Sequence, residues 1–404
     1  MAETTPTPAQ PPWIGLADLL RMSMKGIDLA PLAAKLIEYA QVHPRAATAM
    51  LDASVILQLR GNREIALQVQ REALKIQRLY TLPHQEPVRL RLLVIVGPGD
   101  MMANSPVEFL VQNSPVATDL LWILPEDEQM PPVPPHDVLF VAVAESEENR
   151  LLLDRLAIWL KDWPRPVLNR PEAIRRLSRD SVSAMLREVP DVELPQTVRA
   201  DRATLQRLAS GELSMRQWLG DGDFPVIVRP VDSHAGKGLE KVDGPAELAD
   251  CLTRQEGTLF FVARFVDYRG ADGLYRKYRI VLMRGVPHLC HLALSSSWMV
   301  HYLSADMLEN PANRAEEAWQ MTHFREEFAL RHASALQAVA RASGLDYLGI
   351  DCSETRDGRL LVFEIDSNMV VHDMDPPDIF PYKAAPMQAV FAAFQAMLGE
   401  VAHG

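Results

Sequence analysis

Three acidic side chains near the end of the chain have the type and spacing needed to hold a metal ion. Glu364 and Asp366 lie two residues apart at the end of the apolar stretch 360–365, and Asp351 precedes them in the same segment. Residues i and i+2 of a strand point to the same face, so Glu364 and Asp366 should project together. Carboxylates gathered on a half-buried face repel one another and lose hydration, so they stay charged only beside a cation. Oxygen ligands of this kind suit magnesium.

The segment 349–368, GIDCSETRDGRLLVFEIDSN, is typical of a β-hairpin that turns at Asp357-Gly358. Asp351 then lies on the first strand, and Glu364 and Asp366 lie on the second. A solvent-facing hairpin with harmless acids is the alternative, but the neighbouring residues are too apolar for an exposed strand. The sequence therefore predicts a Mg²⁺ site made by these three carboxylates.

A magnesium site of this kind needs a polyphosphate and cations to hold it, and candidates lie upstream. Arg229 ends an apolar strand and is followed by the glycine-rich turn 236–238, whose backbone N–H groups can approach phosphate oxygens closely. Further on, Lys277 and Arg279 alternate on a strand and so share a face. They are expected to hold phosphate oxygens, or else to form the exposed side of that strand.

The composition fits a soluble protein of two or three domains. The chain has 404 residues, is 48% hydrophobic and 23% charged, and carries a net charge of −12, which argues against a nucleic-acid scaffold or a binder of anionic membranes. No apolar run reaches the roughly 18 residues of a membrane span. The first residues lack the features of a signal peptide, so a cytoplasmic location is expected. Cys251, Cys290 and Cys352 are scattered, as expected for buried free thiols in a reducing compartment.

Hydrophobic patterning divides the chain into four parts. Residues 1–12 resemble a disordered tail, and 13–87 show helical periodicity that resembles a tetratricopeptide-type helix pair. This helical region is expected to serve either as a cap on the next domain or as a peptide-binding groove. Strands alternate with helices in 88–190, which predicts a parallel sheet, and 191–404 forms the last part.

In this order, the motifs resemble the ATP-grasp superfamily over roughly residues 90–400. The matching stretches are VIVRP with Arg229, SHAGKG from Ser233 to Gly238, FFVARFV (260–266), YRIVLMRGVP with Arg279, and the hairpin with its acids. PVLNRP (166–171) also resembles the end of the preceding domain in glutathione synthetases and ribosomal-protein glutamate ligases. The resemblance implies an α/β (α+β) fold, in which an ATP-grasp domain follows a Rossmann-like domain and the helical region. Its small lobe would span about 197–266 and its large lobe about 267–404.

The resemblance implies a set of ATP and Mg²⁺ contacts. The phosphates would be held by Arg229, Ser233, Gly236, Lys237, Gly238, Lys277 and Arg279. Adenine would meet the backbone of Arg264, Phe265 and Val266, and the ribose would meet Asp267 or Asp272. Asn368 would be a further metal ligand or a turn residue, beside Asp351, Glu364 and Asp366.

This sequence departs from the family pattern at several of these positions. Arg229 stands where the family has lysine, and Ala263-Arg264 replace an acidic pair. Asp366 stands where the family has asparagine. The stretch after Asn368 also differs, which indicates an acceptor substrate that is not a standard one for the family.

The reaction implied is ATP-dependent ligation of a carboxylate to an amine. The γ-phosphoryl group moves to the carboxylate, and the amine attacks the acyl phosphate to give an amide, ADP and phosphate. Arg229, Arg279 and His301 are the expected catalytic side chains. No arginine lies between Arg284 and Arg314, so His301 or His372 is expected to hold the reacting carboxylate. The substrate is expected to contact Ser296, Ser297, Trp298, His301, Tyr302 and His372.

Two other functions remain open at this stage. One is an ATP-grasp kinase that phosphorylates a small molecule. The other is a non-catalytic ATP-binding scaffold that recruits a partner through its N-terminal helices. The expected partners of the ligase are a small-molecule or peptide carboxylate and an amine, and analogy with related ligases adds a homodimer.

Overall fold

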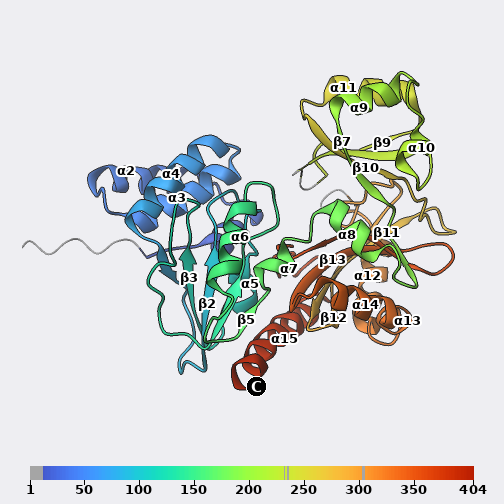
Figure 1. The fold of residues 1–404 in the computed structure, drawn as a ribbon. Helices are drawn as coiled ribbons and strands as arrows, with labels where there is room; N and C mark the ends of the chain where they lie inside the picture. Colours follow the sequence, from blue (N-terminus) through green and yellow to red (C-terminus); the bar gives the residue numbers. More distant parts are fainter. Residues whose placement is uncertain (1–11, 232, 234–235, 303–304) are drawn as a thin grey trace, which may run out of the picture.

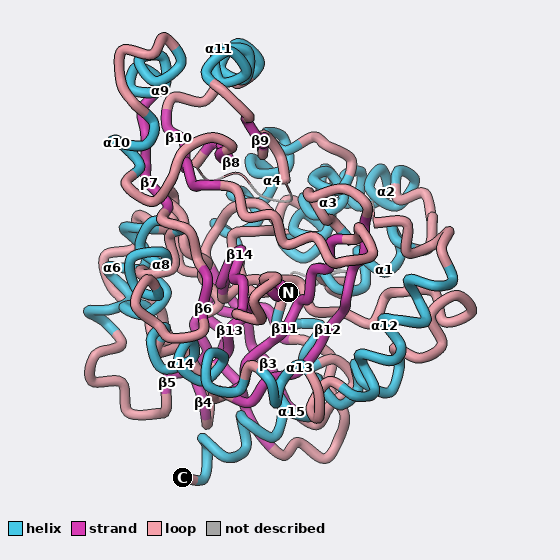
Figure 2. Tube along the Cα trace, turned by 90° about the vertical axis from the view of Figure 1, so that its right-hand side faces the viewer, coloured by secondary structure: helices cyan, strands magenta, loops and turns pink. Residues whose placement is uncertain are grey.

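The computed structural model describes residues 12–404 except 232, 234–235 and 303–304. The described chain is a mixed α/β protein with three β-sheets, which confirms the fold class (Figure 1). Two of the sheets face each other across a cavity, and Figures 1 and 2 both place the smaller of these above the larger.

Four helices open the described chain, as the periodicity of 13–87 predicts. They are α1 (Leu16–Met24), α2 (Ala30–Val42), α3 (Ala47–Leu59) and α4 (Arg63–Ile76). The first three bury an apolar core of their own around Leu19 and Ile56. Leu51 of α3 and Leu74 of α4 belong instead to the core of the following sheet. The helical region is therefore packed against the rest of the protein, and its likeness to a tetratricopeptide pair stays a prediction.

A five-stranded sheet follows, with the order β1-β3-β2-β4-β5. Four strands, β2 (Leu90–Val96), β3 (Val116–Trp122), β4 (Val138–Val141) and β5 (Val167–Leu168), run parallel. The edge strand β1 (Leu79–Thr81) pairs antiparallel with β3. The helices of this part are α5 (Val107–Val111), α6 (Arg150–Trp159), α7 (Pro171–Ile174) and α8 (Arg179–Leu186).

The small sheet is wholly antiparallel in the order β7-β10-β8-β9. Its strands are β7 (Thr197–Asp201), β8 (Val226–Pro230), β9 (Glu240–Val242) and β10 (Leu259–Arg264), and its helices are α9 (Arg202–Ala209), α10 (Met215–Leu219) and α11 (Pro245–Arg254). These elements, called the small lobe below, enclose a separate apolar core.

The third sheet has the order β12-β11-β13-β14-β6. It comprises β6 (Val192–Glu193), β11 (Tyr275–Met283), β12 (Val286–Ser295), β13 (Tyr347–Glu354) and β14 (Leu360–Asp366). Three helices precede β13: α12 (Pro311–His323), α13 (Phe328–Arg331) and α14 (Ala333–Ser343). The last helix is α15 (Ala384–His403).

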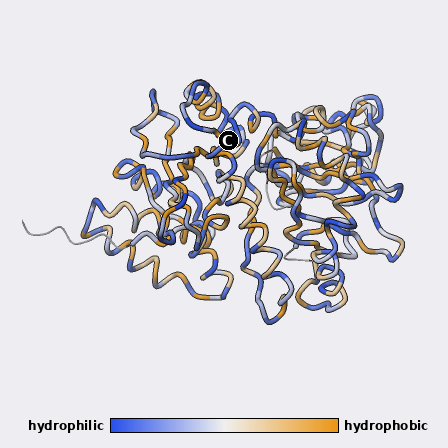
Figure 3. The backbone as a smooth tube through the Cα atoms, turned by 90° about the horizontal axis from the view of Figure 1, so that it is seen from below, coloured by the Kyte–Doolittle hydropathy of each residue, from blue (hydrophilic) through white to orange (hydrophobic). Residues whose placement is uncertain are grey.

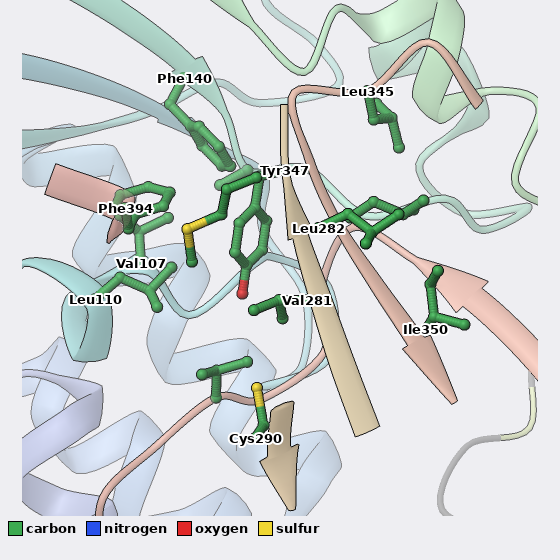
Figure 4. Packing of buried hydrophobic residues seen from close by; sticks show 14 of the residues in the cluster. Val107, Leu110, Phe140, Val281, Leu282, Cys290, Leu345, Tyr347, Ile350 and Phe394 are labelled. Atoms are coloured by element: carbon green, nitrogen blue, oxygen red, sulfur yellow. The ribbon is translucent and has the colours of Figure 1, made fainter. Parts of the chain in front are cut away.

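The parallel sheet and the β11–β14 sheet share one continuous core. Phe140 of β4 and Tyr347 of β13 meet with ring centroids 6.2 Å apart, and Phe394 of α15 contacts both rings (Figure 4). The small lobe is joined differently. Arg199 of β7 forms ion pairs with Glu147 and with Asp180, at 2.6 and 2.9 Å.

Two further expectations are met in the described part of the chain. No helix there is long and apolar enough to cross a membrane, and hydrophobic and hydrophilic residues alternate along the tube in Figure 3. Cys251, Cys290 and Cys352 are all buried free thiols.

Candidate active site

A cavity of about 600 Å³ lies between the small lobe and the β11–β14 sheet. Side chains from β8, β10, β11, β13, β14 and α1 line it. It brings together many of the residues predicted from the sequence, which are Arg229, Gly236, Arg264, Phe265, Val266, Lys277, Arg279, Trp298, His301, Tyr302, Asp351, Glu364, Asp366, Asn368 and His372.

The predicted hairpin places its acids on one face. Strands β13 and β14 pair antiparallel, with Asp351 directly opposite Glu364 and Gly349 opposite Asp366. Gly358 turns the chain with a φ of 84°, a conformation that glycine adopts readily. Asp351, Glu364 and Asp366 all line the cavity.

Asp351 is paired with two cations from the neighbouring strand β11. Its carboxylate accepts hydrogen bonds from Lys277 Nζ at 3.0 Å and from Arg279 Nε and Nη2 at 2.8 and 2.9 Å. Burial alone would raise the pKa of Asp351, but Arg279 and Lys277 hold it well below its usual range. Within the described residues, no group of three or more His, Cys, Asp or Glu side chains is arranged to hold a metal ion. In this structure Asp351 is the counter-ion of two cations, and its role as a metal ligand stays a prediction.

Glu364 has a partner that the sequence did not suggest. Arg179, the first residue of α8, donates a hydrogen bond to the Glu364 carboxylate and also lines the cavity. Burial opposes the charge of Glu364, yet Arg179 keeps its pKa below the ordinary value. Arg179 stands 185 residues before Glu364, so no local pattern could have joined them.

Asp366 and the residues after it offer oxygen atoms that lack partners. Burial, and then the charge of Glu364, raise the pKa of Asp366 to about 7. Ser367 Oγ and Asn368 Oδ1 are buried and have no hydrogen-bond partner among the described residues. Asn368 itself is fixed, because its Nδ2 donates to Met102 O at 2.5 Å. Glu364, Asp366 and Asn368 therefore offer oxygen atoms that fit a divalent cation.

The predicted phosphate-binding residues are only partly assembled. Arg229 is buried, its Nε donates to Ser233 Oγ at 3.2 Å, and burial lowers its pKa to about 10, so it remains a cation at neutral pH. Gly236 lines the cavity, whereas Lys237 is exposed and Lys237 and Gly238 are absent from the described lining.

The strand that joins the lobes runs along the cavity as predicted. Residues 263–266 line it, and the Arg264 side chain turns away to pair with Glu193 and Asp221. The candidate ribose acids do not reach the described lining. Asp267 accepts hydrogen bonds from Tyr275 and Arg356, and Asp272 pairs with Arg276.

The predicted substrate residues separate into two groups. Trp298, His301, Tyr302 and His372 line the cavity, whereas Ser296 and Ser297 are exposed and outside the described lining. The pKa of His301 is lowered by burial and by the nearby Lys277 and Arg279. The pKa of His372 is also lowered, chiefly by burial.

A buried ion network beside these residues was not predicted. Lys383, which is 4% exposed, lies 3.1 Å from Glu317 and 2.9 Å from Asp375, and it donates a hydrogen bond to Tyr302. Asp375 and Tyr302 line the cavity, so the network fixes part of its wall. Its members lie far apart in sequence, which leaves no spacing signal.

Comparisons with known proteins give fold relatives only. No protein-family model matches the chain, and no curated protein matches it significantly. A RimK domain ATP-grasp protein from Sphaerobacter thermophilus is 14% identical, with a TM-score of 0.42, over 78% of this chain and 100% of that one. The VanG D-Ala:D-Ser ligase from Enterococcus faecalis is 12% identical, with a TM-score of 0.47, over 77% of this chain and 99% of that one.

Proposed function

We propose that this protein is an ATP-dependent carboxylate–amine ligase of the ATP-grasp type. The observation that carries the proposal is the cavity between the two lobes, where Arg179, Arg229, Lys277 and Arg279 face Glu364 and Asp366. Cations and carboxylates gathered at one end of an otherwise largely apolar cleft suit a metal-bound polyphosphate. The ordered ATP-grasp motifs in the sequence support the same function.

The protein's own side chains would stabilise the phosphoryl group as it moves. Arg229 supplies a buried positive charge at the end of β8. Asp351 holds Lys277 and Arg279 in place, so that their charges are fixed before the nucleotide binds. Preorganised charge of this kind stabilises a transition state without the cost of reorganisation. Lys277 and Arg279 lie near His301, so they would also attract a substrate carboxylate held there.

Glu364, Asp366 and Asn368 would hold Mg²⁺. When bound, the ion would neutralise charge on the β- and γ-phosphates. Arg179 keeps Glu364 ionised in the absence of the ion. No side-chain nucleophile is required, since the amine attacks the acyl phosphate directly.

The test is to incubate the purified protein with Mg²⁺, ATP and a bacterial small-molecule extract, and to follow phosphorus by NMR. We expect ADP and an equal amount of free phosphate. Glu364→Ala should abolish this turnover, whereas Glu326→Ala, which changes an exposed glutamate away from the cavity, should not. Omission of Mg²⁺ should have the same effect as the Glu364 substitution.

Other outcomes would replace the proposal. Phosphate carried on a new compound would make the protein a kinase. Binding of ATP without any cleavage would favour the scaffold function, and a pull-down with the full chain would then identify the partner. If wild type and Glu364→Ala form free phosphate equally, the β13–β14 hairpin has no role in the reaction.

A further inference from the structure

Helix α1 is fixed at its first turn by two buried carboxylates from different parts of the chain. Asp52 of α3 accepts hydrogen bonds from the N–H groups of Ile14 and Gly15, at 2.9 and 3.0 Å. Glu108 of α5 accepts from Ala17 N at 2.8 Å. Carboxylates at a helix N-terminus satisfy free N–H groups and oppose the positive end of the helix dipole. The start of α1 is thus held against both the helical region and the parallel-sheet domain.

The other end of α1 is tied to the loop that follows the metal hairpin. Arg21 forms an ion pair with Asp373 at 2.6 Å and donates a hydrogen bond to Gln112. The Arg21 guanidinium also lies over the Phe109 ring, 5.1 Å from its centroid. These contacts place α1 beside loop 369–375, which contains the predicted substrate residue His372.

The position of α1 turns an apolar face toward the cavity. Leu16, Leu20 and Met24, spaced four residues apart, line it, while Ala17 and Leu19 pack inward. Residues at i, i+4 and i+8 form one stripe on a helix. Met24 is 48% exposed and Leu20 is half-buried, so packing within the protein leaves part of this stripe accessible.

Methionines from two loops extend this apolar face. Met101 and Met102 follow β2, and Met369 and Met374 follow β14, and all four line the cavity. Methionine is flexible and polarisable, and it adapts to ligands of varied shape. We call the surface made by these four methionines, Leu16, Leu20 and Met24 the α1 wall.

Met102 and Met369 of the α1 wall adjoin Asn368, whereas Leu16, Leu20 and Met24 lie apart from the predicted phosphate residues of a neighbouring cavity. A smaller adjoining cavity of about 80 Å³ is lined by Arg229, Ser233, Glu364 and Asp366, and no α1 residue belongs to its described lining. The described lysines and arginines of the large cavity are Arg179, Arg229, Arg264, Lys277 and Arg279, and none of them comes from α1 or from loop 369–375. A carboxylate would be drawn to those cations, so the α1 wall is left for the other substrate.

We propose that the amine substrate of this ligase carries an apolar side chain or tail that packs against the α1 wall. That the bound amine is a substrate rests on the proposed function, but the apolar site itself can be tested without turnover. A polar acceptor would lose hydration against this wall without gaining a partner. An aliphatic or aromatic group would bury surface there, and each buried methylene is worth roughly a fourfold gain in affinity.

The experiment uses N-phenyl-1-naphthylamine, an uncharged probe whose fluorescence rises in apolar surroundings. It is titrated into the full chain in the presence of Mg²⁺ and a non-hydrolysable ATP analogue, and then displaced by straight-chain primary amines from propylamine to octylamine. We expect displacement to strengthen roughly fourfold per methylene. Carboxylates of the same lengths should displace the probe less effectively at each length.

Two variants and a control locate the site. Leu20→Asp and Met24→Asp should weaken probe binding at least tenfold, whereas Leu151→Asp, on a residue of α6 that is 73% exposed, should not change it. Met24 is exposed enough that its substitution leaves folding intact, so a folding defect in Leu20→Asp cannot decide the result. Circular dichroism confirms that each variant is folded.

The outcomes separate this inference from the proposed function. Wild-type probe binding by both α1 variants, no dependence on amine length, or stronger displacement by carboxylates would each overturn the α1-wall inference. If amine binding depends on chain length and is lost in the variants, but the protein never cleaves ATP, the apolar site is supported and the ligase function is refuted. If the protein turns over polar amines only, and Met24→Asp leaves this turnover unchanged, the ligase function is supported and the apolar substrate is refuted.

Discussion

Replacing Asp351 with asparagine tests the role that the structure gives to this carboxylate. Asp351 is 5% exposed and is the shared acceptor for Lys277 and Arg279. Asparagine has nearly the same volume, so the change removes charge without opening a cavity. Removing one partner of a buried ion pair costs about 3–5 kcal/mol, because the remaining charge is left uncompensated. Two cations lose their counter-ion here, so we expect a loss near the upper end of that range.

The assay is urea unfolding in EDTA, so that no divalent cation contributes. Hydrogen exchange in β11 and β13 reports the local free energy of opening, which is needed because the small lobe has its own core and the chain need not unfold in one step. Asp378→Asn, an exposed residue outside the cavity, is the matched control and should change stability by less than about 0.5 kcal/mol. Adding Lys277→Met to Asp351→Asn should recover about 1–3 kcal/mol, because one stranded cation is then removed.

A small effect would refute the reasoning. If Asp351→Asn unfolds within about 0.5 kcal/mol of wild type in EDTA, Asp351 is not the counter-ion that holds Lys277 and Arg279. Its carboxylate would then again be a candidate metal ligand, as the spacing in the sequence first indicated.

Three more predictions follow from other contacts. Burial raises the pKa of Asp52 to about 6 and of Glu108 to about 7, so the folded chain binds protons more tightly than the unfolded chain. The free energy that protects the α1 amides from hydrogen exchange should therefore fall as pH rises from 4 to 8, by about 3 kcal/mol per carboxyl. Asp52→Asn should make this free energy less dependent on pH. Lys383→Met should cost about 3–5 kcal/mol in thermal or urea unfolding, because it strands a fully buried glutamate; a neutral result would mean that this glutamate is protonated. Gly349→Ala places a Cβ 2.6 Å from a methionine sulfur and should lower the free energy of unfolding in urea by about 1–3 kcal/mol. Gly399→Ala, which has open space around it in α15, should raise this free energy by about 0.5–1 kcal/mol. Equal effects of the two substitutions would contradict the packing around Gly349.

Local patterns in the sequence predict the elements and part of the site. Alternation and the Asp-Gly turn gave the hairpin, and its register places Asp351 opposite Glu364. The i+2 rule put Lys277 and Arg279 on one face, where they both line the cavity. These features depend on neighbours within one strand or one turn, so the sequence contains them directly.

Pairings between distant residues could not be predicted in this way. Arg179 reaches Glu364 across 185 residues, and Arg21 reaches Asp373 across 352. Such contacts depend on how whole elements pack, which periodicity does not encode. The pairing of Asp351 with Lys277 and Arg279 was missed for the same reason, because the pattern of acids does not show which cations lie beside them in space. The sequence also gave no indication that α1 lines the cavity, because a leucine stripe on a helix is usually part of a core.

The separate core of the small lobe has a consequence for ionic strength. The parallel sheet and the β11–β14 sheet are joined by apolar packing, which salt does not weaken. The small lobe is held to its neighbours partly by the ion pairs of Arg199 with Glu147 and Asp180, whose side chains are partly exposed to solvent. Added salt screens pairs of that kind over about 10 Å at 0.1 M and over a shorter distance at higher concentration. The width of the cleft, and with it the access to the cavity, should therefore respond to salt while the rest of the fold does not.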